Sequence, residues 1–384
     1  MQGWRIDMED AHVVKIPMSD EPPFSEWSFF AVFDGHAGTK AAQHSAENIL
    51  KTLLATAQFR KVCAVLFPDF FIGLVNEVLA LEKMSEKPAI MDEETRKLLA
   101  EGIKCGFLNL DAKMLERNEQ GEDNERSGTT AICAIVTPTH IFLANLGSSD
   151  SRAVLSRRDQ VAFGTEDHKP FVPKERDRIV NAGGSVMIQR VNGSLAVSRA
   201  LGDFEYKAVP GLNVTQQLVS PEPDVYTIPR NPEVDEFLLL ACDGIYDVMD
   251  NAELCDFVQS RLRITDDLSN VANQVRGNHL LLIAFFSGLK ILDACLSKGS
   301  RDNMTVILVC FDAAPKVDPE AVRREEEWRA KITDRVTEIL AEEDRKEDGR
   351  EQLDAEQVMR ELGSAVMKAC PQGESGVGGH AHIC

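Results

Sequence analysis

The sequence lacks the features that would hold a chain in a membrane or join it by disulfide bonds. Its most apolar segment, residues 280–289, is far shorter than the ~20 residues that a spanning helix needs. Its nine cysteines are scattered, with no Cys-x-x-Cys pair, which favours buried thiols in a reducing compartment. We recognise no signal peptide and no lipidation motif. These absences lead us to expect no membrane span and no disulfide framework.

Positive charge is scarce. The chain has 42 lysines and arginines against 62 aspartates and glutamates, a formal net charge of −20. So acidic a chain is repelled by the phosphates of nucleic acid, and we expect no nucleic-acid partner. Any site for a phosphate must be made locally positive by metal ions and arginine. Apolar residues make up 43% of the 384, enough for one large domain or two smaller ones.

The segment that organises the chain is residues 27–38. A run of mostly apolar residues, rich in aromatic and β-branched types, ends at Asp34-Gly35-His36. This pattern predicts a buried strand closed by a turn. A carboxylate at the end of a buried strand needs a cation or several donors, because an unpaired buried charge is costly. Gly35 allows a sharp turn that exposes its carbonyl.

The same pattern occurs twice more. Residues 237–242 form an apolar run closed by Asp243-Gly244, and Asp302 stands just before the apolar run 304–311. One Asp-Gly after a strand is usually only a turn. Three acids at the ends of three hydrophobic strands instead predict a cluster of carboxylates.

Helices and strands fall in separate groups, which indicates an α+β layered fold rather than βαβ repeats. Residues 165–212 are long and weakly regular, and they form either a flap near the site or a structural loop. In residues 1–12, an extended chain would put Arg5 and Glu9 on one side; the segment alone favours a surface edge strand with a solvated ion pair. The pattern predicts helices at 39–57, 93–114, 173–182 and 252–262 and a hairpin of 128–136 with 140–146.

Several spaced motifs together carry a resemblance to a known family. They are Arg5-x3-Glu9-Asp10, Asp34-Gly-His-Ala-Gly38, Asp243-Gly244 and Arg301-Asp302-Asn303, and the stretch 185–203 is similar to the flap region of the same proteins. With these residues in order, the chain resembles the metal-dependent protein serine/threonine phosphatases of the 2C type, the PPM family, and most of all its animal alpha/beta forms.

The resemblance implies a fold and a site. The fold is a four-layer α-β-β-α sandwich, two antiparallel sheets flanked by helices, with a small C-terminal helical appendage. Two divalent metals, Mg²⁺ or Mn²⁺, would lie between the sheets at one end, with a weaker third. The implied metal ligands are Asp34, Asp243, Asp302, the Gly35 carbonyl, Glu9 through water, and, for the third metal, Asp150; Arg5 would bind the substrate phosphate and His36 would act as general acid.

The chemistry of these residues agrees with that implication. All the implied ligands are oxygens, which favours a hard cation over zinc. Two such ions can share a water, lower its pKa and direct it in line at phosphorus. The planar fork of Arg5 matches two phosphate oxygens. His36 can supply the proton that the leaving serine or threonine alkoxide needs. The expected activity is therefore hydrolysis of phosphoserine and phosphothreonine.

The chain also departs from the family pattern. The residues that normally precede the Arg5 motif are absent, so the start looks truncated, and insertions are expected near 59–90 and 276–290. Ser148-Ser149 separate Gly147 from Asp150, where the family has Gly-Asp directly. We expect a catalytic domain at 1–312, a helical domain at 316–370 and a disordered tail at 371–384.

Two functions remain open at this point. One is an active phosphatase; the other is a catalytically inactive, phosphatase-like scaffold that binds signalling proteins. The intact acids, Arg5 and His36 favour the enzyme, whereas the truncation and insertions favour the scaffold. For the enzyme, the resemblance implies a monomer in the cytoplasm and nucleus whose substrates are phosphoproteins, notably protein kinases of signalling pathways.

Overall fold

The computed structural model describes the chain as two compact units. One comprises Met1–Phe257 with Leu268–Ala314, and the other Val258–Asp267 with Pro315–Cys384. The residues described are 1–67, 91–120, 126–147, 151–265, 282–284 and 291–344.

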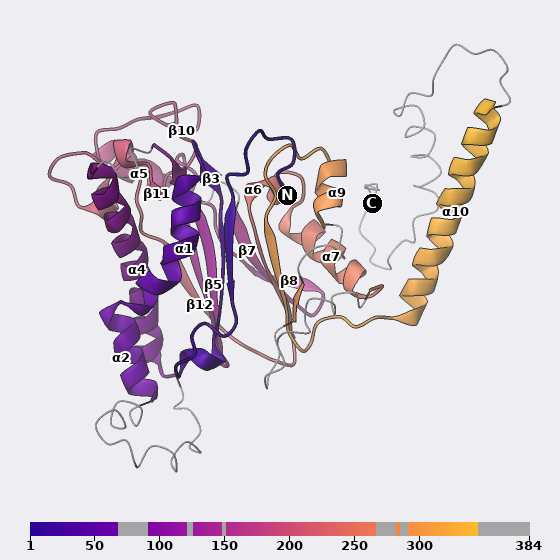
Figure 1. Cartoon of the computed structure of the whole chain (residues 1–384), viewed down its shortest axis with the longest axis horizontal. Coiled ribbons are helices and arrows are strands. Elements are labelled where there is room, and N and C mark those ends of the chain that lie inside the picture. Colours follow the sequence, from indigo (N-terminus) through magenta and orange to yellow (C-terminus); the bar gives the residue numbers. More distant parts are fainter. Residues whose placement is uncertain (68–90, 121–125, 148–150, 266–281, 285–290, 345–384) are drawn as a thin grey trace. The chain divides into compact units, whose positions relative to one another are not determined.

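Two five-stranded antiparallel sheets form the centre of the first unit (Figure 1). The first sheet has the order β1-β2-β5-β6-β12 and the second β14-β15-β13-β7-β8. The strands of the first are β1 (Ala11–Lys15), β2 (Ser28–Phe33), β5 (Ala131–Val136), β6 (His140–Leu146) and β12 (Asp224–Pro229). Those of the second are β14 (Leu282–Ala284), β15 (Val306–Cys310), β13 (Asp235–Ala241), β7 (Arg152–Arg157) and β8 (Gln160–Gly164).

β2 shows how the two hydrophobic layers are divided. Its side chains alternate between faces. Phe30 and Val32 join the core between the two sheets, whereas Phe29, Ala31 and Phe33 join a second core beneath helices. Every residue of β2 is buried, which explains why its sequence after Ser28 is a continuous apolar run rather than an alternating one.

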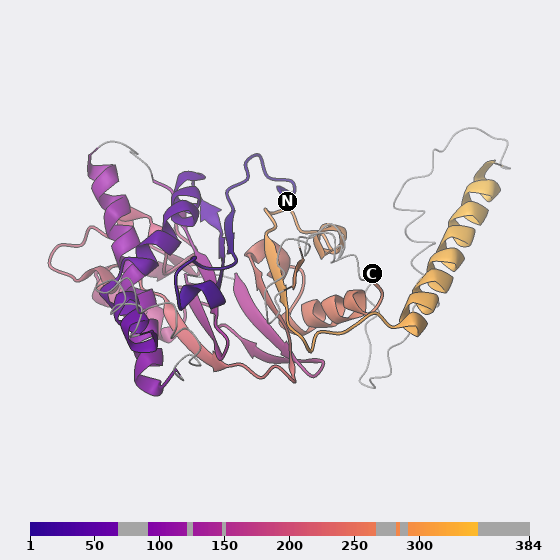
Figure 2. The same ribbon diagram turned by 60° about the horizontal axis from the view of Figure 1, so that its bottom comes forward.

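Helices cover the outer faces of both sheets, as Figures 1 and 2 show. On the first sheet lie α1 (Lys40–Leu54), α2 (Ala57–Leu66) and α4 (Glu93–Glu119); beyond the second lie α6 (Asp243–Tyr246), the beginning of α7 (Asn251–Leu262) and α9 (Ile291–Ser297). The predicted four-layer α-β-β-α sandwich is confirmed.

Local differences from the sequence expectations have identifiable causes. A separate helix, α2, begins where Thr56 accepts a hydrogen bond from the Phe59 amide, and the apolar pattern alone did not reveal this cap. α4 begins after the capping Asp92 and runs five residues beyond the predicted end at 114. Within the expected insertion 276–290, residues Leu282–Ala284 form an edge strand paired with β15.

Small elements connect the sandwich to residues 165–212. A three-stranded sheet of order β11-β4-β3 joins the end of that segment to the turn after Asp34. The short elements are η1 (Phe24–Glu26), β3 (Gly35–His36), β4 (Gly128–Thr129), α5 (Pro173–Asn181), β9 (Val186–Met187), β10 (Arg190–Val191), β11 (Leu201–Gly202), η2 (Phe204–Tyr206) and η3 (Val214–Gln216).

The second unit contains α10 (Pro319–Asp344). Asp318 accepts a hydrogen bond from the Glu320 amide at 3.0 Å, as expected of a cap, and Arg261 pairs with Glu325 at 3.2 Å. The rest of the expected helical domain 316–370 and the expected tail 371–384 lie in 345–384, outside the described residues. No helix among the described residues is long and apolar enough to cross a membrane.

The position of Phe30 between the sheets gives a test of the fold. Because its side chain is 0% exposed, Phe30→Ala should lower the free energy of unfolding by ~3–5 kcal/mol. Val180→Ala, at a side chain that is 52% exposed, should change it by no more than ~0.5 kcal/mol. Urea denaturation measures both, and equal effects would show that Phe30 is not in the core.

Candidate active site

Two acids of the second sheet lie next to each other at one end of the sandwich. Asp243 is the first residue of α6, directly after β13 and Cys242, and Asp302 stands just before β15. Ala241 at the end of β13 pairs with Val306 at the start of β15, so the antiparallel ladder brings both acids to the same edge.

Two acids of the first sheet reach the same end. Asp34 follows β2, and Asp10 precedes β1. Ala11 pairs with Phe33, which places these two acids at one edge of the first sheet. Asp10 accepts a hydrogen bond from Thr305 Oγ1, beside the start of β15, at 2.7 Å, which links the two sheets at this end.

The four carboxyl groups act on one another electrostatically. Burial, together with the charge of Asp10, raises the pKa of Asp34 well above its usual range. Burial and the charges of Asp34 and Asp302 raise the pKa of Asp243 further still. The pKa of Asp10 is also raised, chiefly by burial. Like charges held near one another in a poorly solvated place lower stability unless protons or a cation compensate them.

The donor set fits a hard divalent cation, since all four side chains offer oxygen and carry excess negative charge. Among the described residues, however, no three His, Cys, Asp or Glu side chains form a group that could hold a metal ion. The assignment of Asp34, Asp243 and Asp302 as ligands therefore stays a prediction, and Asp150 lies outside the described residues.

Glu9 and Gly35 lie against each other. A Cβ on Gly35 would come within 2.3 Å of the Glu9 carbonyl oxygen, so only glycine permits this approach. The Glu9 carboxylate accepts a hydrogen bond from the Gly38 amide at 2.7 Å. The structure thus brings Glu9 to the Asp34 turn, as the resemblance implies.

Arg5 contacts Asp302 rather than Glu9. Its Nη2 lies 2.6 Å from Asp302 Oδ2, and the two side chains are 53% and 27% exposed. The hydrogen bond with Asp302 raises the pKa of Arg5. The interpretation of residues 1–12 as an edge strand was wrong for its first ten residues, because β1 begins only at Ala11.

Asn303 fixes the segment that carries Arg5. Its Nδ2 donates to the carbonyls of Gln2 and Asp7 at 2.8 and 3.0 Å, and its Oδ1 accepts from the Glu9 amide at 2.8 Å. The Met304 amide donates to the Met1 carbonyl at 2.8 Å. One buried amide side chain thus replaces strand pairing as the anchor of this segment.

His36 is held by Asp203, a residue to which sequence reasoning gave no role. His36 Nε2 and Asp203 Oδ2 are 2.7 Å apart, and the Asp203 side chain is 4% exposed. Gly128 lies beneath both, because a Cβ there would be 2.1 Å from Asp203 Oδ2 and 2.5 Å from His36 Nε2. The end of 165–212 therefore reaches the site, which favours the flap interpretation.

Ser151 completes the surroundings of Asp34, since its Oγ donates to Asp34 Oδ2 at 3.1 Å. Sequence reasoning also missed Ser151, Asn303 and Asp10. Asp10 directly follows Glu9, and Asn303 directly follows Asp302. Their position next to an implied ligand was the signal that could have pointed to them. For Ser151 and Asp203 no spacing rule points to the site.

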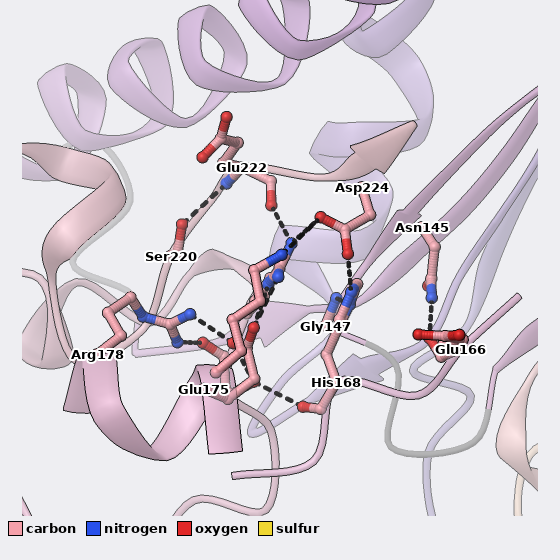
Figure 3. A network of polar contacts seen from close by, with 12 residues as sticks. Asn145, Gly147, Glu166, His168, Glu175, Arg178, Ser220, Glu222 and Asp224 are labelled. Atoms are coloured by element: carbon pink, nitrogen blue, oxygen red, sulfur yellow. Dashed lines mark hydrogen bonds and ion pairs between the residues drawn. The ribbon is translucent and has the colours of Figure 1, made fainter. Parts of the chain in front are cut away.

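A buried ionic group stabilises the base of the flap (Figure 3). Glu175, 1% exposed, pairs with Arg199 at 2.6 Å and also with Arg178. Burial opposes ionisation, but the hydrogen bond and charge of Arg199 prevail and lower the pKa of Glu175 to about 2.

Two families match this sequence. The family described as "Protein phosphatase 2C" matches residues 1–280, and "Protein serine/threonine phosphatase 2C, C-terminal domain" matches residues 305–378.

Curated relatives match over nearly the whole chain. Protein phosphatase ppm-1.A of Caenorhabditis elegans is 47% identical over 92% of this chain and 67% of its own length. Protein phosphatase 1B of Mus musculus is 46% identical over 100% of this chain and 86% of its own. Protein phosphatase 1A of Homo sapiens is 45% identical, over 97% and 84%.

Solved structures share the fold. A crystal structure of a phosphatase from a pathogenic strain of Toxoplasma gondii superposes with a TM-score of 0.54 at 25% identity, over 82% of this chain and 91% of that one. The serine-threonine phosphatase 2C from Toxoplasma gondii gives 0.57 at 21% identity, over 80% and 92%.

The depressed pKa of Glu175 predicts how stability changes in acid. Its folded value of about 2 lies below the ordinary 4.5, so its stabilisation is complete above pH ~4.5 and is lost as the pH falls towards 2, a loss of roughly 3 kcal/mol. Between pH ~4.5 and 2, the unfolding free energy of the Glu175→Gln variant should therefore fall by roughly 3 kcal/mol less than that of the wild type. Chemical denaturation at several pH values measures it; Glu338→Gln, at an exposed position, is the control. An identical fall in Glu175→Gln would contradict the prediction.

The carboxylate cluster predicts stabilisation by divalent cations. Mg²⁺ offsets the repulsion among the acids, and at 100 times its Kd it should stabilise the protein by about 2.7 kcal/mol, seen as a higher Tm. Asp243→Asn should reduce this gain, whereas Asp334→Asn on α10, at an exposed residue, should not. Equal gains in both variants would show that Asp243 takes no part in holding the cation.

Proposed function

On the premise that this chain belongs to the protein phosphatase 2C family, we propose that the residues at this end of the sandwich form a centre for two Mg²⁺ or Mn²⁺ ions. The chain is a serine/threonine protein phosphatase, and the family generally depends on these metals. The comparisons do not favour the alternative of an inactive scaffold.

One observation carries the proposal of the metal centre. Acids from four strand ends come to one end of the sandwich, and burial, with the charges of the neighbouring acids, raises the pKa values of Asp10, Asp34 and Asp243. A protein whose fold only needed to be stable would not gather several buried acids here with one arginine to compensate them, because such acids lower stability. Asp34, Asp243, Asp302, the Gly35 carbonyl and, through water, Glu9 would hold the two ions, and Asp150 would hold a weaker third.

Substrate binding falls to Arg5. When bound, the metal ions supply Lewis-acid activation of the water that attacks phosphorus. The Arg5 guanidinium, more than half exposed, can exchange its contact with Asp302 for two oxygens of the phosphate. Asn303 keeps the backbone on both sides of Arg5 in place, so the guanidinium approaches the phosphate from a fixed direction.

Proton donation falls to His36. The leaving serine or threonine oxygen needs a proton, because an alkoxide is a poor leaving group. Asp203, hydrogen-bonded to His36 Nε2 at 2.7 Å, fixes the ring orientation. The other ring nitrogen, Nδ1, is then the atom that donates.

The substrates that we propose are phosphoproteins, in particular protein kinases of signalling pathways, encountered by a monomer in the cytoplasm and nucleus. The exposure of the site supports a protein substrate, since the side chains of Arg5 and Asp302 are 53% and 27% exposed. The scattered cysteines support a reducing compartment.

Hydrolysis of p-nitrophenyl phosphate tests the function. Recombinant protein should turn over this substrate with Mn²⁺ and stop when EDTA removes the metal. Asp243→Asn should lower kcat by more than about 100-fold, because even outer-shell partners of a metal account for roughly 10–100-fold. Asp334→Asn on α10 should match the wild type. Absence of metal-dependent turnover would support the inactive scaffold, and full activity in Asp243→Asn would refute the ligand assignment.

A further inference from the structure

The short segment 165–168 holds the end of β6, as Figure 3 shows. Asn145 Nδ2 donates to the Glu166 carbonyl at 2.6 Å. Gly147, the residue directly after β6, donates its amide hydrogen to Nδ1 of His168 at 3.2 Å. Thus a segment at the base of the flap fixes the chain where it leaves the first sheet.

The same segment holds the beginning of β7 in the second sheet. Arg152 donates through Nε and Nη2 to both carboxylate oxygens of Asp167, at 2.8 and 2.9 Å. Thr165 Oγ1 accepts from the Ala153 amide at 3.1 Å. Ser151, the residue directly before Arg152, donates through its Oγ to Asp34. Segment 165–168 therefore spans both sheets next to the central acid of the site.

The hydrogen bonds of His168 define its protonation. Because the Gly147 amide donates to Nδ1, this nitrogen carries no proton, and the ring proton is on Nε2. Nε2 lies 3.0 Å from Asp224 Oδ2 and donates to it. The side chain of His168 is only 5% exposed, and both of its ring nitrogens are engaged in hydrogen bonds.

A chain of ion pairs continues from His168 to the base of the flap. Asp224 Oδ1 is 2.9 Å from Arg199 Nη1, and Arg199 pairs in turn with the buried Glu175. Gly147 also packs directly against the backbone of Arg199. Its φ is +76°, and a Cβ there would lie 1.4 Å from the Arg199 carbonyl oxygen. The flap base and the strand end are thus packed directly against each other.

We propose that His168 is a positioning residue for the metal centre: its Nδ1 ties Gly147, at the end of β6, to the segment 165–168, which also holds the beginning of β7 beside Ser151, the donor to Asp34. The inference rests on the metal centre of the proposed function and adds a role for a residue outside the ligand set. It also means that the flap base and the metal centre share one buried framework, so a change at one affects the other.

Two substitutions separate the two hydrogen bonds of His168. In His168→Asn, the amide oxygen can take the place of Nδ1 and accept from Gly147, while the bond to Asp224 is lost. In His168→Gln, the longer side chain can place its amide nitrogen near Nε2 and donate to Asp224, while the acceptor for Gly147 is lost. His140→Asn is a matched control, because His140 is a buried histidine at the opposite end of β6.

The test measures Mn²⁺ binding and backbone protection, neither of which requires turnover. Mn²⁺ binding is followed by the rise in Tm during titration. In His168→Gln the half-saturating concentration of Mn²⁺ should rise about 10-fold, the size typical of outer-shell changes. Hydrogen exchange of a peptide covering residues 143–147 should be about 5-fold faster in metal-free protein, as loss of one hydrogen bond predicts. His168→Asn and His140→Asn should stay within about 2-fold of wild type in both measurements.

Two outcomes would overturn the proposal: wild-type Mn²⁺ binding in folded His168→Gln, or a larger loss in His168→Asn than in His168→Gln. If His168→Gln does not fold, Ser198→Ala replaces it, since Ser198 Oγ donates to the His168 carbonyl at 2.6 Å; unchanged Mn²⁺ binding and exchange in that variant would equally reject the role. If the proposed function itself were wrong, the wild type would bind no Mn²⁺ or show no metal-dependent turnover, which distinguishes the two failures.

Discussion

Repulsion among acids at the ends of hydrophobic strands is the constraint that shapes the site end of this protein. Burial and mutual charge raise the pKa values of Asp34, Asp243 and Asp10. Individual hydrogen bonds, such as those from Ser151 and Thr305, reduce the repulsion without cancelling it. In the proposed metal centre divalent cations would supply the missing charge, so the arrangement that weakens the metal-free fold is also the source of the proposed affinity for metal.

Close backbone approaches build the site from segments far apart in sequence. At Gly35 the chain touches the Glu9 carbonyl, and at Gly244 a Cβ would lie 2.0 Å from the Asn303 carbonyl oxygen. Asn303 in turn binds the backbone of residues 2–9. These contacts use backbone atoms and one amide, which leaves the carboxylates of the neighbouring acids available for chemistry.

Much of the architecture could be predicted from sequence because it depends on local patterns. Apolar runs closed by Asp-Gly located Asp34 and Asp243 correctly at strand ends, and the layered fold followed from the grouping of strands and helices. Partners across long separations could not be predicted in the same way. Arg5 meets Asp302 and His36 meets Asp203, and such pairs depend on how loops are folded back, which leaves no periodic trace. His168 was equally hidden, since a buried histidine with two satisfied nitrogens has no special spacing.

The alternation of side chains along β2 has a consequence for folding. Because this one strand contributes to both hydrophobic layers, helices that left the first sheet would expose Phe29, Ala31 and Phe33 to water. A slip of one residue against β5 would exchange the side chains of the two layers and carry the turn at Asp34 away from its partners. Correct register in β2 is therefore a precondition for catalysis as well as for cooperativity, and a misregistered chain would be both inactive and prone to aggregate.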